Sequence, residues 1–241
     1  MKAVTSLSPS PEHATTQAAR LASWRDAGLE PVSLNCAAEA ELLKPHYDVE
    51  YVTTESVSTA EFGKPFVTLK AMVDWIATQS RPVLILNSDL HLHPDPEKLG
   101  RLERLATDGL PYLLQWNVDA DMGRPVVEPC GISAFVFNPK YASLLGESFL
   151  CLGQPWWDYW LPYVFVKQGI PLYGAGASLA FHVRHEQHAW SQDNWRVCAM
   201  EMARLVGAAA VDDMASCSRF SAFVYREIVE HTTMVDWEKP G

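Results

Sequence analysis

A short apolar run is the centre of the chain's hydrophobic pattern. Residues 83–86 are consecutive large aliphatic residues, and a polar stretch follows them at once. A run this short and rich in β-forming residues predicts a strand covered on both faces, as in a parallel sheet. If the chain stays extended beyond it, Asn87, Asp89 and His91 point to the same side. Ligands of open α/β sheets bind beyond the carboxyl ends of the strands, so we expect a site here.

The first part of the chain alternates between strand-like and helix-like segments. Residues 3–34 read as strand, helix and strand, and Ala18, Leu21 and Trp24 form the apolar face of that helix. Such a unit has a right-handed crossover and therefore parallel strands. The pattern predicts an α/β fold with a mixed, mostly parallel sheet flanked by helices.

The second half of the chain predicts a loop and two late strands. Residues 117–130 are polar and contain several turn-forming residues, so we expect a loop there. Residues 170–173 and 179–183 read as separate strands, with Gly174 at the start of a flexible connection.

The end of the chain has a different character. From Ser191 the pattern reads as helical to the last residues. No internal repeat or low-complexity linker divides the chain before that point. We therefore expect an α/β domain at residues 1–190 and a helical C-terminal extension, residues 191–241, packed on it.

Composition narrows the class of protein. Apolar residues make up 48% of the 241 residues, which is ample for a packed core. The formal net charge is −10, and no run of Lys or Arg offers a phosphate-binding face, so we do not expect a nucleic-acid partner. Five widely spaced cysteines without a C-x-x-C pair indicate a reducing compartment. Because no signal-peptide core and no apolar window of about 18 residues is visible, we expect a cytoplasmic protein without a membrane span.

The stretch of residues 84–92 resembles the D-x-D motif of GT-A-fold glycosyltransferases, in which an apolar strand ends in Asp-x-Asp. Asn87 stands at the first Asp position and Asp89 at the second. The order of elements over residues 3–190 is also similar to that family. The resemblance implies a GT-A-like (Rossmann-like) domain that transfers a sugar from a nucleotide-diphosphate donor to a saccharide or another hydroxyl-bearing acceptor. It also implies a divalent metal, Mn²⁺ or Mg²⁺, that bridges the donor diphosphate.

The chemistry of such a transfer explains the residue types at this position. A leaving nucleoside diphosphate gains negative charge, which a cation held by oxygen ligands neutralises. Asp89 would supply an anionic ligand, whereas Asn87 would supply a carbonyl oxygen or a hydrogen bond to ribose. In metal-using members of the family a late histidine completes the metal site, and His182 and His185 both follow a predicted strand. A solvated run of histidines gives the same pattern, and Asp89 also fits a strand-end turn.

An acid among aromatic residues marks residues 154–160. Aromatic rings pack against the apolar face of a sugar, so Trp156 and Trp157 are candidates for the sugar pocket. The resemblance implies that Asp158 acts on the acceptor side as the general base of an inverting enzyme. A retaining mechanism would not need this base. Tryptophans at helical spacing also fit a packed core, and Asp158 also fits a local cap.

Two serines follow the first predicted strand, at the place where GT-A enzymes receive the nucleotide base and ribose. The resemblance makes Ser6 and Ser8 candidates for the nucleotide site. Such residues are also ordinary in turns.

Two other functions fit parts of the pattern. Asp89, His91 and His93 match the D-x-H-x-H motif of metal-dependent hydrolases built on β/α barrels, and late histidines could complete a zinc or binuclear site. That motif normally sits on the first barrel strand, and the residues after His93 are few for a full barrel of about 250 residues. A non-catalytic α/β binding protein would also tolerate Asn87 in place of an acid.

Overall fold

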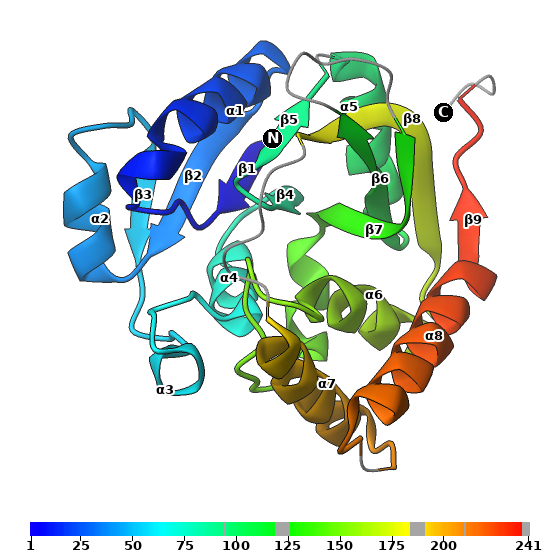
Figure 1. The fold of residues 1–241 in the computed structure, drawn as a ribbon. Helices are drawn as coiled ribbons and strands as arrows, with labels where there is room; N and C mark the ends of the chain where they lie inside the picture. Colours follow the sequence, from blue (N-terminus) through cyan, green and yellow to red (C-terminus); the bar gives the residue numbers. More distant parts are fainter. Residues whose placement is uncertain (94, 119–125, 184–190, 210, 238–241) are drawn as a thin grey trace.

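A computed structural model describes residues 1–93, 95–118, 126–183, 191–209 and 211–237, and only the backbone of residues 126–130 and 177–178. Within these residues nine strands form one sheet, and helices cover both of its faces (Figure 1). The predicted class, a mixed and mostly parallel sheet flanked by helices, is confirmed.

Strands and helices alternate in the first half of the chain and less regularly in the second. The first half contains β1 (Lys2–Thr5), the 3-10 helix η1 (Pro11–His13), α1 (Ala14–Asp26), β2 (Glu30–Asn35), α2 (Ala37–Leu43), β3 (Glu50–Thr53), α3 (Thr59–Phe62), α4 (Leu69–Ile76), β4 (Val83–Leu86) and β5 (Leu90–Leu92). The second half contains α5 (Pro96–Leu105), β6 (Leu110–Val118), β7 (Val126–Phe137), the 3-10 helix η2 (Pro139–Leu144), α6 (Trp157–Lys167), β8 (Leu172–Val183), α7 (Gln192–Val206), α8 (Met214–Glu230) and β9 (Thr232–Met234). None of the helices in the described part of the chain is long and apolar enough to cross a membrane.

The strand order of the sheet is β3-β2-β1-β4-β7-β6-β8-β5, and β9 pairs with β8 beside that path. Parallel ladders join β1 to β2, β1 to β4 and β2 to β3. β4 and β6 both pair antiparallel with β7, and β6 runs parallel to β8. The carboxyl ends of β1 and β4 therefore lie side by side, and the polar residues that follow these strands meet at one edge of the sheet.

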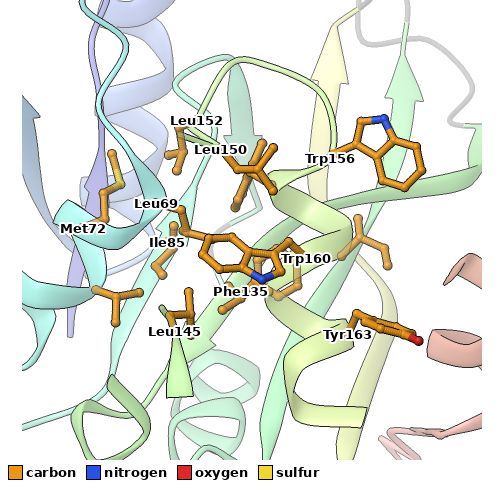
Figure 2. Packing of buried hydrophobic residues seen from close by; sticks show 14 of the residues in the cluster. Leu69, Met72, Ile85, Phe135, Leu145, Leu150, Leu152, Trp156, Trp160 and Tyr163 are labelled. Atoms are coloured by element: carbon orange, nitrogen blue, oxygen red, sulfur yellow. The ribbon is translucent and has the colours of Figure 1, made fainter. Parts of the chain in front are cut away.

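β4 lies between two hydrophobic cores. Its side chains alternate, as strand geometry requires: Val83 and Ile85 belong to one core, and Leu84 and Leu86 to the other. Residues of α4, α6, α7 and α8 build the first core, and residues of α1 and α5 build the second. Figure 1 shows α6, α7 and α8 grouped on the opposite side of the molecule from α1. Figure 2 shows Ile85 in the first core near Phe135, its partner on β7.

α1 presents a partly polar face to the sheet. Trp24 is buried as predicted, but Ala18 is exposed, and Gln17 and Arg20 are buried instead. Three side chains on this face hydrogen-bond to the backbone of residues 89–92. The predicted apolar face was therefore wrong in part, because α1 contacts the sheet through hydrogen bonds as well as apolar packing.

β8 is one continuous strand, whereas the sequence predicted two strands and a flexible break. Gly174 lies inside it because a side chain would collide with β9: an added Cβ atom would lie 2.8 Å from Met234 Sδ and 2.9 Å from Thr232 Cγ2. β9 also corrects the prediction that the chain is helical from Ser191 to its end. The predicted loop over residues 117–130 was too long, because Asn117 lies on β6 and residues 126–130 belong to β7.

The C-terminal helices share a core with the sheet. Cys198 and Met202 of α7 and Phe220 of α8 belong to the same core as Phe135 of β7. The predicted domain boundary at residue 190 falls outside the described residues and stays a prediction.

Candidate functional site

A cleft of about 1010 Å³ opens at the carboxyl ends of β1 and β4, a size typical of small-molecule sites. Its walls come from the loop after β1, the turn after β4, α1, β6, β8 and the segment that leads into α6. Eight of the residues predicted for the site line this cleft: Ser6, Ser8, Asn87, Asp89, Trp156, Trp157, Asp158 and His182. His185 lies outside the described residues.

Side chains from α1 and β2 hold the loop after β1. The Gln17 amide accepts a hydrogen bond from the backbone N–H of Ser8 (2.7 Å) and donates one to the backbone oxygen of Ser8 (2.9 Å). Asn35 Nδ2 donates to the backbone oxygen of Leu7 (2.9 Å) and to Ser6 Oγ (3.2 Å). Ser6 and Ser8 therefore line the cleft from a loop whose backbone is fixed by several hydrogen bonds.

The chain turns after β4 and does not stay extended. The backbone N–H of Leu90 donates to the backbone oxygen of Asn87 (3.3 Å), which closes a β-turn between β4 and β5. Asn87 and Asp89 line the cleft, but His91, on β5, does not. The expectation that all three share one side was wrong for His91, because it assumed an extended chain.

Asp89 and His182 form a close polar pair in the cleft. Asp89 Oδ2 lies 3.3 Å from His182 Nε2. The side chain of His182 is 11% exposed and that of Asp89 is 35% exposed. Strand pairing sets this geometry, because Leu90 pairs with His182 between β5 and β8, and Asn117 pairs with His182 between β6 and β8. Two residues distant in the chain, both predicted as ligands of one metal, are thus neighbours.

A row of hydrogen bonds continues from His182 along β6. His182 Nδ1 lies 3.1 Å from Asn117 Oδ1, which also accepts a hydrogen bond from Gln115 Nε2 (2.9 Å). Gln115 Oε1 accepts in turn from Ser133 Oγ of β7. The register of β6 with both neighbouring strands is irregular near Leu114. Bulges of this kind occur beside functional sites, where they change the direction of side chains.

Positive and negative groups lie together at this end of the cleft. Arg20 lies beside the turn, and its Nε donates to the backbone oxygen of Asp89 (3.1 Å). Burial lowers the pKa of Arg20 from its ordinary value, and the charge of Asp89 partly opposes that shift. His13 and Lys64 also line the cleft. The Arg20 guanidinium therefore suits an anionic ligand at this end, with the Asp89 carboxylate placed to hold a cation beside it.

Asp158 lies in the first turn of α6, where burial changes its acidity. Burial raises the pKa of Asp158 from 3.8 to about 7, although hydrogen bonds from the backbone at Asp158, Tyr159 and Trp156 oppose that shift. Trp156, the residue before the helix, has a left-handed backbone with φ of 77°, and no other non-glycine residue of the described chain has a positive φ. Backbone strain collects at functional sites, and a carboxyl group with a pKa near neutral suits general acid–base chemistry.

Trp156 and Trp157 line the cleft but bury most of their surface, with exposed fractions of 3% and 2%. Trp156 stacks on Phe220 with ring centroids 5.4 Å apart, and its Nε1 donates to the backbone oxygen of Trp195 (3.1 Å). Figure 2 shows Trp156 among the buried residues of the first core. Tyr159 and Trp195 line the cleft and are only partly buried. A ligand can therefore reach more of Tyr159 and Trp195 than of the two predicted tryptophans.

The described residues contain no group of three or more His, Cys, Asp or Glu side chains that could hold a metal ion. Asp89 and His182 still fit a divalent transition-metal cation such as Mn²⁺, because a carboxylate and an imidazole can both bind it while water and substrate phosphates complete its shell. Two ligand atoms at adjacent coordination positions are about 3.0 Å apart. The 3.3 Å between Asp89 Oδ2 and His182 Nε2 is close to that value.

The fold removes the structural basis of the hydrolase alternative. His91 and His93 do not line the cleft with Asp89. The described strands form an open sheet with mixed directions and not the β/α barrel on which the D-x-H-x-H motif normally sits.

Sequence reasoning missed four polar residues of this site: Gln17, Arg20, Gln115 and Asn117. A signal for the first two is present, because Gln17, Arg20 and Trp24 follow the i, i+3, i+7 spacing of one helix face. Gln115 and Asn117 alternate at the end of an apolar strand. In both elements, the cue is a polar residue at a position where the pattern predicts a buried one.

No protein-family model matches the chain, and no curated protein matches it. Similar solved structures include a protein from Mycobacterium tuberculosis H37Rv in complex with manganese, with 14% identity and a TM-score of 0.47 over 82% of this chain and 96% of that one. The 4-diphosphocytidyl-2C-methyl-D-erythritol synthase of Anaerococcus prevotii has 14% identity and a TM-score of 0.38 over 92% of this chain and 96% of that one. A protein from Desulfovibrio desulfuricans G20, named as a candidate nucleotide-diphospho-sugar transferase, has 10% identity and a TM-score of 0.39 over 96% of this chain and 97% of that one. Likenesses at this level carry no conclusion about activity, which depends on the chemistry of the cleft.

Proposed function

We propose that this chain is a metal-assisted glycosyltransferase, which moves a sugar from a nucleotide-diphosphate donor to a hydroxyl-bearing acceptor. The observation that supports this best is a single cleft that contains both the Asp89–His182 pair and Asp158. The pair suits a diphosphate and its cation, and Asp158 suits the deprotonation of a hydroxyl group.

The donor nucleotide would lie along the edge of the sheet. Ser6 and Ser8 offer polar groups to the base and ribose from a fixed loop. Arg20 lies where its guanidinium can pair with a phosphate oxygen. Asp89 and His182 would hold Mn²⁺ or Mg²⁺, which when bound neutralises the charge of the leaving diphosphate.

The acceptor would lie on the side of α6, where Asp158 serves as the general base. Its carboxylate takes the proton of the acceptor hydroxyl while that oxygen bonds to the anomeric carbon of the donor sugar. The bond from this carbon to the diphosphate breaks, and its electron pair leaves with the nucleoside diphosphate. A base with a pKa of about 7 is partly ionised at neutral pH and still binds a proton well. Trp156 and Trp157 shape the sugar pocket together with Tyr159.

Asp89→Ala tests the donor side. Wild-type protein with Mn²⁺ and UDP, GDP, CDP or ADP in turn should gain thermal stability with one of them, because a ligand that binds only the folded state stabilises it. Asp89→Ala removes the anionic ligand, so the metal-dependent part of the shift and the metal-dependent hydrolysis of a matching nucleotide sugar should both disappear. Asp108→Ala should keep both, because Asp108 is exposed and outside the cleft.

The same assay separates the alternatives. A full shift and full hydrolysis in Asp89→Ala would contradict the metal role of Asp89. No response of the wild type to any nucleotide would favour a binding protein of another kind. Release of pyrophosphate, instead of a nucleoside diphosphate, would identify nucleotidyl transfer and contradict sugar transfer.

A further inference from the structure

The hydrogen bonds that lead to His182 have a defined direction. Ser133 Oγ donates to Gln115 Oε1, so the other end of this amide, Nε2, is the end that donates to Asn117 Oδ1 (2.9 Å). Asn117 Oδ1 carries no proton, so its contact of 3.1 Å with His182 Nδ1 requires an N–H on the imidazole. The row from Ser133 to His182 therefore assigns a proton to Nδ1.

A proton on Nδ1 decides what the other ring nitrogen can do when the imidazole is neutral, whereas an imidazolium carries a proton on both nitrogens. In a neutral imidazole, Nε2 then carries a lone pair, and in His182 this atom lies 3.3 Å from Asp89 Oδ2. Two electron-rich atoms at that distance repel each other unless a positive charge lies between them. In the opposite tautomer, Nε2–H would donate to Asp89 and would offer no lone pair to a cation.

We propose that Gln115 and Asn117 are positioning residues that keep a proton on Nδ1 of His182. Nε2 of the same ring is thereby reserved for a divalent cation shared with Asp89. This inference rests on the proposed function, because it assumes that cation.

Burial and strand pairing hold this row of hydrogen-bonded side chains in place. Ser133 is 2% exposed and His182 is 8% exposed, so both ends are buried in the protein. Strand pairing aligns Asn117 with His182 and keeps them adjacent. Partners behind a metal-binding histidine generally fix its tautomer and the orientation of its ring.

Gln115→Glu should reverse the row without touching His182. A carboxylate at this position cannot donate, so the Asn117 amide has to turn its NH₂ group toward it. The same NH₂ group would then face His182 Nδ1 and donate to it, which moves the imidazole proton to Nε2. A loss of packing alone would not change which nitrogen carries the proton.

Nitrogen-15 NMR of the labelled, metal-free chain in alkaline buffer, where an ordinary imidazole is neutral, reports the position of this proton. His182→Gln identifies the signal among the eight histidines. We expect the proton on Nδ1 in the wild type and on Nε2 in Gln115→Glu. The affinity for Mn²⁺ alone, measured by calorimetry, should fall by about 10–100-fold in Gln115→Glu. Gln168→Glu should change neither property, because it adds the same charge at an exposed position outside the cleft.

Ser133→Ala is a second variant, which keeps the test decisive if Gln115→Glu does not fold. Loss of the donor to Gln115 should allow both directions of the row and give a mixture of tautomers. The inference is overturned if Nδ1 of His182 carries no proton in the wild type, or if every folded variant keeps the same tautomer. Failure of the wild type to bind Mn²⁺ would instead overturn the metal of the proposed function, and the NMR result would still decide the direction of the row.

Discussion

The two carboxyl groups of the cleft have different surroundings. Asp89 lies at a turn, beside the imidazole of His182, and its backbone oxygen accepts a hydrogen bond from Arg20 Nε. Asp158 lies in the first turn of α6, next in sequence to Trp157 and Tyr159, and burial raises its pKa to about 7. Carboxyl groups in different surroundings can take different roles in one reaction, such as holding a cation and accepting a proton.

Asp158→Asn should lower the rate of sugar transfer by about 10²–10⁴-fold, because the amide cannot accept the proton. In the wild type the rate should rise with pH through about 7 and then level off, as Asp158 loses its proton. Steady-state kinetics over this pH range measures both effects, with Asp108→Asn as the exposed control. A full rate in Asp158→Asn would indicate a retaining mechanism or another base.

The raised pKa of Asp158 also has a consequence for stability. Between about pH 4 and about pH 7 the folded state holds a proton on Asp158 that the unfolded state has lost, since the pKa rises from 3.8 to about 7 on folding. This group therefore makes the protein less stable as pH rises through that window. Asp158→Asn removes this dependence. The melting temperature of the variant minus that of the wild type should therefore increase as pH rises. Equal pH dependence in both proteins would contradict the pKa shift.

Local signals in the sequence coincide with the ends of several elements. Ser10 precedes η1, Asp95 caps α5 by accepting from the backbone N–H of Lys98 (3.0 Å), and Gly28 has φ of 78° just after α1. These signals act within a few residues and are visible in the sequence. The continuity of β8 is not, because the need for glycine at Gly174 comes from its contact with β9.

The polar row along β6 could not be predicted for a similar reason. Asn117 reads as a loop residue because polar side chains are rare in buried strands, and it bonds to Gln115 on β6 itself and to His182 on β8. From the sequence alone, Arg20 reads as a solvent-facing residue of a helix. Its hydrogen bond to the backbone of the turn after β4 forms only in the folded sheet. Position after a buried strand was enough to single out Asp89, whereas these partners depend on which strands become neighbours.

The connection from α5 to β6 should depend on Gly109. An added Cβ atom at Gly109 would lie 2.2 Å from the backbone oxygen of Pro171 and 2.8 Å from Tyr173 Cε2. Gly109→Ala should therefore lower the free energy of unfolding by roughly 1–3 kcal/mol, as overpacking does. Urea denaturation measures this change.

Gly100 in α5 provides a matched control for the substitution of Gly109. An added Cβ atom there would meet nothing closer than Arg104 Nη1 at 3.9 Å. Gly100→Ala should raise the free energy of unfolding by about 0.5–1 kcal/mol, because alanine loses less backbone entropy in a helix. A similar effect of both substitutions would contradict the crowding at Gly109.

At the scale of the molecule, one sheet joins two cores, and the C-terminal helices complete one of them. α7 and α8 contribute Met202, Phe220 and Ile228 to the core that also contains Phe135 of β7. Because this core has no boundary between the sheet and these helices, we expect the described chain to unfold in one step.

Ile228→Ala tests this cooperativity. Ile228 is fully buried, so its truncation should cost about 2–5 kcal/mol and lower the unfolding midpoint seen by tryptophan fluorescence and by far-ultraviolet circular dichroism alike. Val229→Ala is the neighbouring control, because Val229 is 47% exposed and its loss should cost less than about 0.5 kcal/mol. A separate early loss of helix in Ile228→Ala would mean that the C-terminal helices unfold as an independent unit.

The edge strands of the sheet influence whether the protein aggregates at high concentration. The strand order ends in β3, with 4 residues, and in β5, with 3, and β9 also has only 3. Unpaired edges of long, flat strands recruit the backbone of other chains and seed fibres. α1 also hydrogen-bonds along β5 through Trp24 and Ser23. The sheet edges of the described chain therefore offer few backbone groups with which another molecule could pair.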